Sequence, residues 1–329
     1  MGMMVDGQWR EDDGSWATGG RFVRRESQFR DSIVAAEGTG AEAPYTAAAG
    51  RYHLYVSLAC PWAHRTLIVR KLKRLENAIS LSVVDPLSGP GGWHFSDGPG
   101  CVPDPIGSAQ FLHQVYARAQ SDYTGRVTVP VLWDKGRGRI VNNESAEIIR
   151  MFNGAFNDIG DATVDLYPPL LRTEIDAVNA DVYENINNGV YKCGFATSQD
   201  AYDEAFDALF AALGRIEARL DRQRYLCGAQ LTEADWRLFT TLIRFDAVYV
   251  GHFKCSLRRI ADYPNLSNYL RELYQVPGIG ETCDFTHIKS HYYRSHVSIN
   301  PTGIVPRGPA MALDTAHDRD RFAAASAAE

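Results

Sequence analysis

The stretch that decides the fold is Leu54-Tyr55-Val56-Ser57-Leu58-Ala59-Cys60-Pro61-Trp62-Ala63-His64-Arg65. A short run of β-forming residues stops within it, and a cysteine followed by a proline then opens a segment with apolar residues at helical spacing. Proline suits the first turn of a helix, where a backbone N–H would have no partner. The pattern therefore predicts a strand at about 52–57 and a helix at about 61–75, with Cys60 at the N-terminus of the helix.

This position favours a reactive thiol. Unpaired N–H groups and the positive end of the helix dipole meet there, and such a setting lowers the pKa of a cysteine from about 8.5 toward or below neutrality. The fourth position of the motif is Ala63, so Cys60 cannot form a disulfide within the motif. It would form a mixed disulfide with another thiol, for which glutathione is the abundant cellular candidate. The alternative interpretation is a buried structural cysteine that happens to precede a proline.

The composition excludes several classes of protein. The chain has 329 residues, 45% hydrophobic and 22% charged, with a net charge of −6. These values are typical of a globular protein and argue against nucleic acid or an anionic membrane as the main partner. No apolar run approaches the roughly 20 residues of a membrane span. Six scattered cysteines suggest neither a disulfide framework nor a zinc site, so we expect a cytoplasmic protein.

The order of patterns predicts four parts of the chain. Residues 1–50 have no periodicity and are expected to form an extended arm. Residues 51–160 begin with a strand, a helix and a second strand at 79–84, a βαβ unit. A long loop with Trp93, a short helix near 108–118, a strand at 127–134, its hairpin partner at 139–141 and a helix at 146–152 follow. Residues 168–300 show helical periodicity alone, including a capping box at Thr232 and Asp235, and 301–329 form a tail.

A β-hairpin that begins at a Val-Pro step and leads to a capped helix is the order of thioredoxin-like glutathione-binding domains. Val129-Pro130 would offer backbone groups to a peptide-like ligand. Glu144 and Ser145 stand at a helix N-terminus, where Glu144 suits the ammonium and Ser145 the carboxylate of a γ-glutamyl group. Ordinary helix capping is the alternative reading of this pair.

Longer motifs extend this interpretation. They are Cys60-Pro61-Trp62-Ala63-His64-Arg65, Gly91-Gly92-Trp93, 125–132, Asn143-Glu144-Ser145, 187–191, 231–235, 291–296 and 300–303. On these motifs the chain closely resembles the glutathionyl-hydroquinone reductases, the Xi class of glutathione transferases, from about residue 51 to 307. The resemblance implies a thioredoxin-like α/β domain followed by an all-α glutathione-transferase C-terminal domain.

The same resemblance implies a cytoplasmic homodimer that reduces glutathionyl-(hydro)quinones with glutathione as co-substrate and without metal. Cys60 would attack the sulfur of the adduct, and a second glutathione would resolve the mixed disulfide. Glutathione would be held by five residues, and three others would face the quinone. The first set is Trp93, Arg126, Val129, Glu144 and Ser145, and the second is Tyr191, Lys289 and Tyr292.

Each assignment has an alternative. Trp93 could cover the core, Arg126 could be a surface charge, and Tyr191 and Tyr292 could be core residues. The spacing of His287, His291 and His296 could suggest a metal, but no acidic or cysteine partner stands beside them in the sequence. At the level of function, the alternatives are an Omega-like thiol transferase or dehydroascorbate reductase, and a non-enzymatic transferase-fold binding module.

Overall fold

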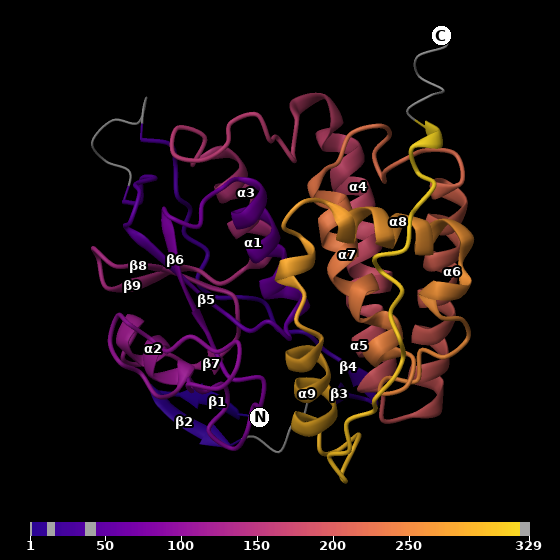
Figure 1. Ribbon diagram of the computed structural model, residues 1–329. Coiled ribbons are helices and arrows are strands. Elements are labelled where there is room, and N and C mark those ends of the chain that lie inside the picture. Colours follow the sequence, from indigo (N-terminus) through magenta and orange to yellow (C-terminus); the bar gives the residue numbers. More distant parts are fainter. Residues whose placement is uncertain (1, 12–16, 37–43, 323–329) are drawn as a thin grey trace. The chain divides into compact units, whose positions relative to one another are not determined.

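The computed structural model describes residues 2–11, 17–36 and 44–322, and these form two compact units (Figure 1). Unit 1 takes the described residues of 1–15, 25–165 and 284–297, and unit 2 takes those of 16–24, 166–283 and 298–329. Parts of the predicted arm (1, 12–16 and 37–43) and of the predicted tail (323–329) lie outside the described residues. Each unit is thus assembled from segments that are far apart in the sequence.

A four-stranded mixed sheet forms the centre of unit 1, in the order β6-β5-β8-β9. Its strands are β5 (Tyr52–Val56), β6 (Ile79–Val83), β8 (Val131–Asp134) and β9 (Arg139–Asn142). β5 pairs in parallel with β6 and antiparallel with β8, and every residue of β5 is buried. The near-continuous run of β-forming residues before Cys60 is therefore explained by a central strand that is covered on both faces.

The predicted strand–helix–strand unit is confirmed, with one boundary corrected. The helix α1 (Pro61–Leu72) joins β5 to β6 and ends three residues before the predicted limit of 75. Arg74 has a φ of +53°, which a helix cannot accommodate, and Leu75 is nevertheless fully buried. Leu75 therefore fits the helical spacing without belonging to the helix.

The predicted strand at 127–134 is shorter than expected. Only Val131–Asp134 pair as β8, and the residues before it contain the cis peptide bond Val129–Pro130. Proline has no N–H for a sheet ladder, so the pairing begins after it. Two helices complete this part of unit 1, α2 (Leu112–Ala119) and α3 (Ser145–Gly154), close to the predicted ranges.

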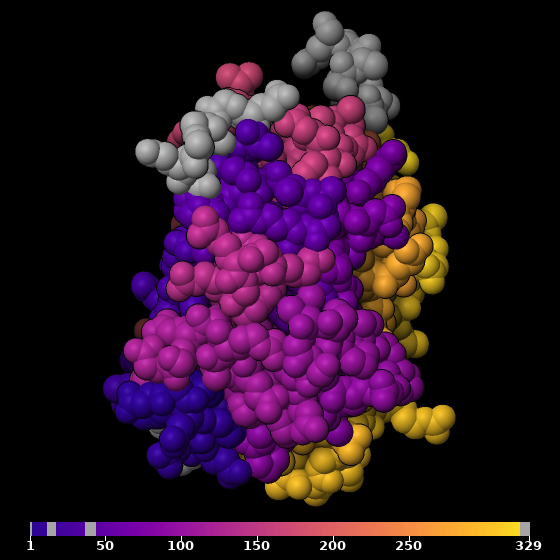
Figure 2. Space-filling view, turned by 90° about the vertical axis from the view of Figure 1, so that its left-hand side faces the viewer, coloured from indigo at the N-terminus to yellow at the C-terminus, as the bar shows by residue number. Residues whose placement is uncertain are grey.

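The first residues of the chain add a small sheet to unit 1. β1 (Gly2–Val5) pairs with β2 (Gln8–Glu11) and with β7 (Gly125–Arg126), all antiparallel. Figure 2 shows these indigo residues against the magenta surface of unit 1. The Trp9 ring of β2 stacks on His113 of α2, with ring centroids 5.0 Å apart. The absence of periodicity in this segment concealed the short strands, because strands of four residues leave too few positions for a pattern.

In the described residues of unit 2 the regular structure is helical apart from the hairpin of β3 (Ala17–Thr18) and β4 (Arg21–Phe22). Its α-helices are α4 (Arg172–Val182), α5 (Gly189–Gly194), α6 (Gln199–Leu220), α7 (Glu233–Arg244) and α8 (Pro264–Gln275). Two π-helical segments, η2 (Tyr183–Asn187) and η3 (Phe245–Tyr249), and three short 3₁₀ turns at 169–171, 260–262 and 280–282 lie among them. The predicted capping box is confirmed, since Thr232 and Asp235 cap α7 reciprocally. α9 (Phe285–Ser295) belongs to unit 1.

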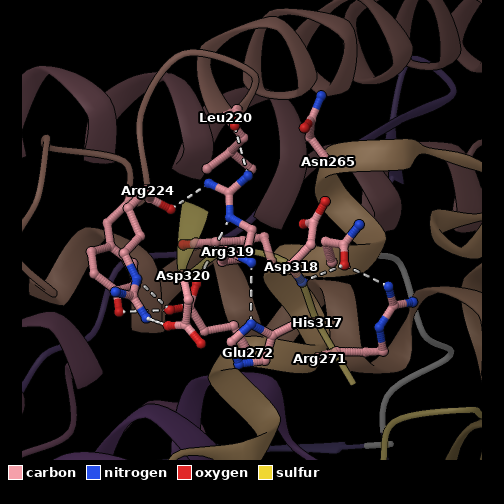
Figure 3. Close-up of polar contacts among 12 residues, drawn as sticks. Leu220, Arg224, Asn265, Arg271, Glu272, His317, Asp318, Arg319 and Asp320 are labelled. Atoms are coloured by element: carbon pink, nitrogen blue, oxygen red, sulfur yellow. Dashed lines mark hydrogen bonds and ion pairs between the residues drawn. The ribbon is translucent and has the colours of Figure 1, made fainter. Parts of the chain in front are cut away.

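Arg319 anchors the end of the described chain in unit 2 (Figure 3), beside the contacts of Gln275 with Leu313 and Thr315 and of Arg224 with Asp320. The Arg319 side chain is fully buried and donates to the carbonyl oxygens of Leu220 and Gln223, each at 2.7 Å, and to that of Arg224. Its Nε lies 3.8 Å from a carboxylate oxygen of Glu272. A guanidinium at the C-terminal end of α6 interacts favourably with the helix dipole, so this contact fixes the last described residues on the helix.

Candidate active site

Cys60 is the N-cap residue of α1, with Pro61 as the first helical residue. The Cys60 backbone is extended, with φ −78° and ψ 121°, and its half-buried side chain does not cap the helix. The Cys60 thiol instead donates to the carbonyl oxygen of Val129, at an Sγ–O distance of 3.6 Å. The predicted placement of Cys60 at the helix N-terminus is confirmed, and Cys60 lies next to the Val-Pro step.

The Val-Pro step is fixed by a buried tyrosine that sequence reasoning missed. The Tyr116 hydroxyl, on α2, donates to the Thr128 carbonyl oxygen at 2.9 Å and accepts from the Thr128 N–H at 3.2 Å. It also accepts from the Asn143 side-chain amide at 3.0 Å. Burial raises the pKa of Tyr116, so the hydroxyl stays protonated and available as a donor. Tyr116 thereby ties the residues beside Cys60 to the residue that precedes Glu144.

Glu144 is the N-cap of α3, and Ser145 is its first residue. One carboxylate oxygen of Glu144 accepts from the Ala146 N–H at 3.1 Å, which is ordinary capping, and the other accepts from the Ser27 hydroxyl at 3.2 Å. The Ser145 side chain is buried and accepts a hydrogen bond of 3.4 Å from Arg65 of α1. The N-terminal parts of α1 and α3, with Cys60 and Glu144, are thus joined by the predicted site residue Ser145 and by Arg65, a contact that the sequence did not indicate.

Arg126 lies on β7, where its guanidinium donates to the Gly2 carbonyl oxygen at 3.3 Å. A cavity of about 100 Å³ adjoins it, lined by residues of the segments 25–28 and 123–128 together with Met3 and Asn143. The cavity wall from 25–28 comes from the predicted arm. Arg25 and Arg126 give the cavity two cationic side chains against the single carboxylate of Glu26. It therefore suits a small anionic group such as a carboxylate.

Trp93 and α9 meet within unit 1. The half-buried Trp93 ring stacks on the buried His291 ring, with centroids 4.7 Å apart and an interplanar angle of 23°. α9 also carries the predicted residues Lys289, which is half-buried, and Tyr292, which is only 1% exposed. The predicted glutathione-side residue Trp93 and the predicted quinone-side residues of α9 therefore lie on two segments in direct contact.

Tyr191 lies in unit 2, on α5, directly after the π-helical segment η2. The Tyr191 ring packs against Phe253 at 5.4 Å and Tyr249 at 6.2 Å between centroids. The Arg24 guanidinium lies 5.1 Å from the Tyr191 ring centroid, and it donates to the Asn188 side chain at 2.8 Å. Arg24 of the predicted arm therefore packs on the Tyr191 ring, a contact that the sequence of the arm did not indicate.

Among the residues that the structure describes, no group of three or more His, Cys, Asp or Glu side chains could hold a metal ion. None of the helices in residues 2–11, 17–36 and 44–322 is long and apolar enough to cross a membrane.

The chain resembles known proteins along its length. Residues 59–155 match the model of the glutathione S-transferase N-terminal domain, and 199–272 match that of the C-terminal domain. The chain is 56% identical to glutathionyl-hydroquinone reductase YqjG of Escherichia coli (strain K12), over 97% of this chain and 99% of that protein. It is 54% identical to glutathionyl-hydroquinone reductase PcpF of Sphingobium chlorophenolicum, over 95% and 98%.

Solved structures agree with these matches. The glutathione-bound structure of YqjG has a TM-score of 0.88, with 54% identity over 97% of this chain and 99% of that one. A Xi-class glutathione transferase of Natrialba magadii has a TM-score of 0.91, with 48% identity over 98% and 97%. The similarity thus covers both units and includes the segments on which the site residues lie.

Proposed function

We propose that this chain, which belongs to the glutathione transferase family as one of the glutathionyl-hydroquinone reductases, removes the glutathionyl group from glutathionyl-(hydro)quinones. Glutathione is its co-substrate, as the glutathione-bound relative supports. The observation that carries the proposal is the position of Cys60, a single thiol at a helix N-terminus, 3.6 Å from the Val129 carbonyl. A monothiol at such a place is suited to forming a mixed disulfide with glutathione.

The reaction balances in two steps. In the first, the Cys60 thiolate attacks the sulfur of the thioether, a Cys60–glutathione disulfide forms, and the carbon–sulfur bond breaks. The electron pair of that bond goes to the ring carbon, which takes a proton and leaves as part of the hydroquinone. In the second, the thiolate of a new glutathione attacks the glutathionyl sulfur, oxidised glutathione leaves, and the Cys60 thiolate is restored.

The glutathionyl group is held by the residues around Cys60 in this proposal. The Val129 backbone pairs with the peptide-like part of the ligand, and Glu144 takes the ammonium of the γ-glutamyl group. Ser145 and the N-terminus of α3 take its carboxylate, which the helix dipole favours. Arg126 and the cationic cavity beside it take the second carboxylate, and the Trp93 ring covers the ligand.

The departing ring needs help that a thiolate cannot give. Charge develops on the ring as sulfur leaves, and phenolic O–H groups can donate to the ring oxygens and supply a proton. Tyr191 and Tyr292 are the donors proposed here, with Lys289 as a cation beside the ring. Their support is the family resemblance, together with the burial of Tyr292 and the tight packing of Tyr191.

The proposal includes a cytoplasmic homodimer. None of the six cysteines, all of which lie in the described residues, forms a disulfide, which fits a reducing compartment. Sedimentation at micromolar concentration should give about twice the mass of the 36.6 kDa chain. A mass close to that of one chain would leave the reaction proposal intact and remove the dimer from it.

One assay tests the reaction. Purified protein is given glutathionyl-hydroquinone and glutathione, and oxidised glutathione and free hydroquinone are followed together. One molecule of each should form per turnover, and Cys60→Ser should form neither. Reduction of a simple mixed disulfide without release of hydroquinone would instead identify an Omega-like thiol transferase. The absence of both activities would favour a non-enzymatic binding module.

A further inference from the structure

Three side chains on one face of α9 fasten that helix to the loop that carries Trp93. The His287 Nε2 lies 2.7 Å from the Pro99 carbonyl oxygen, and the His291 Nδ1 lies 2.9 Å from that of Pro86. The Ser295 hydroxyl accepts from the Ser88 N–H at 2.9 Å. Residues spaced by four lie on the same face of a helix. The histidine spacing that resembled a metal site in the sequence is therefore a docking face for residues 86–99.

His291 is the member of this face that reaches a predicted site residue. A carbonyl oxygen only accepts, so the His291 Nδ1 carries a hydrogen and donates it to Pro86, which fixes the orientation of the ring. With its edge held in this way, the imidazole presents its face to the Trp93 indole at 4.7 Å. The neighbouring ring of Tyr292 lies edge-on to His291, with centroids 5.3 Å apart.

We infer that His291 is a positioning residue for the reaction: it holds the Trp93 ring in place over the glutathionyl group, and it ties that ring to the helix that carries Tyr292. The inference rests on the proposed function, because it takes Trp93 as part of the glutathione site. A half-buried tryptophan on a glycine-containing loop has many rotamers open to it. Stacking on a ring that is itself fixed by a hydrogen bond removes most of them before the ligand binds, which strengthens binding through preorganisation.

The test separates the stacking contact from the hydrogen bond. All variants carry Cys60→Ser, so that glutathione binds without reacting, and the Kd for glutathione is measured by calorimetry. His291→Asn can still donate to the Pro86 carbonyl but has no ring, and we expect its Kd to rise about three- to tenfold, the range of one lost aromatic contact. His291→Phe keeps the ring and loses the donor, and its Kd should stay within about threefold of the parent.

Trp93→Ala completes a double-mutant cycle. If His291 acts through Trp93, His291→Asn changes the Kd by less than about twofold when Trp93 is already alanine. His287→Asn is the matched control, because it alters the same helix face and the same kind of contact without touching the Trp93 ring; its Kd should match the parent. In enzyme with Cys60 intact, His291→Asn should raise the KM for the glutathionyl substrate more than it lowers kcat.

The outcomes that overturn the inference are distinct from those that overturn the proposed function. If Trp93→Ala leaves the Kd unchanged, Trp93 is no part of the glutathione site and the site assignment fails. If Trp93→Ala raises the Kd and His291→Asn does not, the role of His291 fails alone. If His291→Asn changed the Kd for glutathione equally with and without Trp93, His291 would not act through the Trp93 ring. If the phenylalanine and asparagine variants changed the Kd equally, His291 would not act by stacking. If circular dichroism shows that the asparagine variant does not fold, His291→Gln takes its place, because it has no ring and still carries a side-chain amide that can donate.

Discussion

The guanidinium of Arg65 donates to the Ser145 hydroxyl at 3.4 Å, and this contact joins the N-terminal ends of α1 and α3. Arg65 is 1% exposed and its guanidinium lies 4.5 Å from the centroid of the Trp62 ring. A buried arginine thus links the helix that begins at Cys60 to the helix that begins beside Glu144.

We expect Arg65→Met to lower the free energy of unfolding by about 1–3 kcal/mol, because a hydrogen bond from a charged group is lost while the volume is largely kept. Urea denaturation measures this change. The variant should also bind glutathione more weakly, since Ser145 loses a partner that orients it. Trp62→Phe is the comparison, because it keeps a ring beside Arg65. Unchanged stability in Arg65→Met would show that the contact contributes nothing.

The reactivity of Cys60 should follow its place at the helix N-terminus. The rate of Cys60 alkylation against pH is expected to have its midpoint below the value of about 8.5 for free cysteine. Cys193→Ala/Cys227→Ala enzyme removes two buried thiols and should give the same curve. With limiting glutathione, mass spectrometry should find one glutathionyl group, located on Cys60. A midpoint at or above 8.5 would contradict the expectation.

Loss of the Tyr191 or Tyr292 hydroxyl should slow the reaction with one substrate and leave the reaction with another nearly unchanged. Tyr191→Phe and Tyr292→Phe are each expected to lower turnover of glutathionyl-hydroquinone by about one to three orders of magnitude, the range of a lost proton donor. Reduction of a simple mixed disulfide should be largely retained, because its leaving thiolate needs no such donor. If both activities fell together, the tyrosines would be structural.

A buried histidine in the sheet predicts a dependence of stability on pH. His53 on β5 lies between the hydroxyls of Ser80 and Ser82, at 2.7 and 2.9 Å, and burial lowers its pKa to about 4. The unfolded chain takes up a proton on His53 near pH 6.5, whereas the folded protein does not. The contribution of neutral His53 to the free energy of unfolding is therefore fully present above about pH 6.5 and is lost as the pH falls toward 4.

Between pH 7 and 5, His53 should therefore contribute a loss of about 2 kcal/mol in the free energy of unfolding. The measurement compares urea denaturation at both pH values for the natural protein and for His53→Gln, which keeps polar contacts but does not titrate. The loss should be smaller in the variant. Equal losses in the two proteins would show that His53 titrates alike in both states.

Arg319 should stabilise unit 2 through the carbonyl groups at the end of α6 (Figure 3). We expect Arg319→Met to lower the free energy of unfolding by about 2–4 kcal/mol, because it leaves the buried Glu272 with one fewer cation and removes several charged hydrogen bonds. Arg321→Met, on the exposed side of the same segment, should change it by less than about 1 kcal/mol. A similar change in both variants would mean that burial of the arginine is unimportant.

The sequence predicted the strand and helix around Cys60, and the start of the helix at Thr232, because local signals agreed at both places. The β-forming run, the proline at the first helical position and the capping box at Thr232 each depend on neighbours in the chain, and each was confirmed. The fold class followed from their order. The end of α1 was predicted three residues too late, because the buried Leu75 keeps the helical spacing after the helix has stopped.

The supporting contacts of the site could not be predicted, because they join residues far apart in the chain. Ser27 meets Glu144, Arg24 meets Tyr191, and His291 meets Trp93, at separations of more than a hundred residues. Ser27 and Arg24 lie in segments without periodicity, and the helical spacing around His291 does not reveal which loop its helix contacts. The pairs become visible only when the fold brings the segments together.

Each unit contains a segment from the other end of the chain, and this determines how the protein would behave after a single proteolytic cut between the units. A protease cut between Asp165 and Leu166 leaves an amino-terminal piece without α9 and a carboxy-terminal piece without the β3–β4 hairpin. Ile288 of α9 is fully buried in unit 1, and Phe22 of the hairpin stacks on Phe195 of unit 2. Each fragment would therefore hold a part that the other needs to complete its core, and the two halves would behave as complementing fragments that stay together until both unfold.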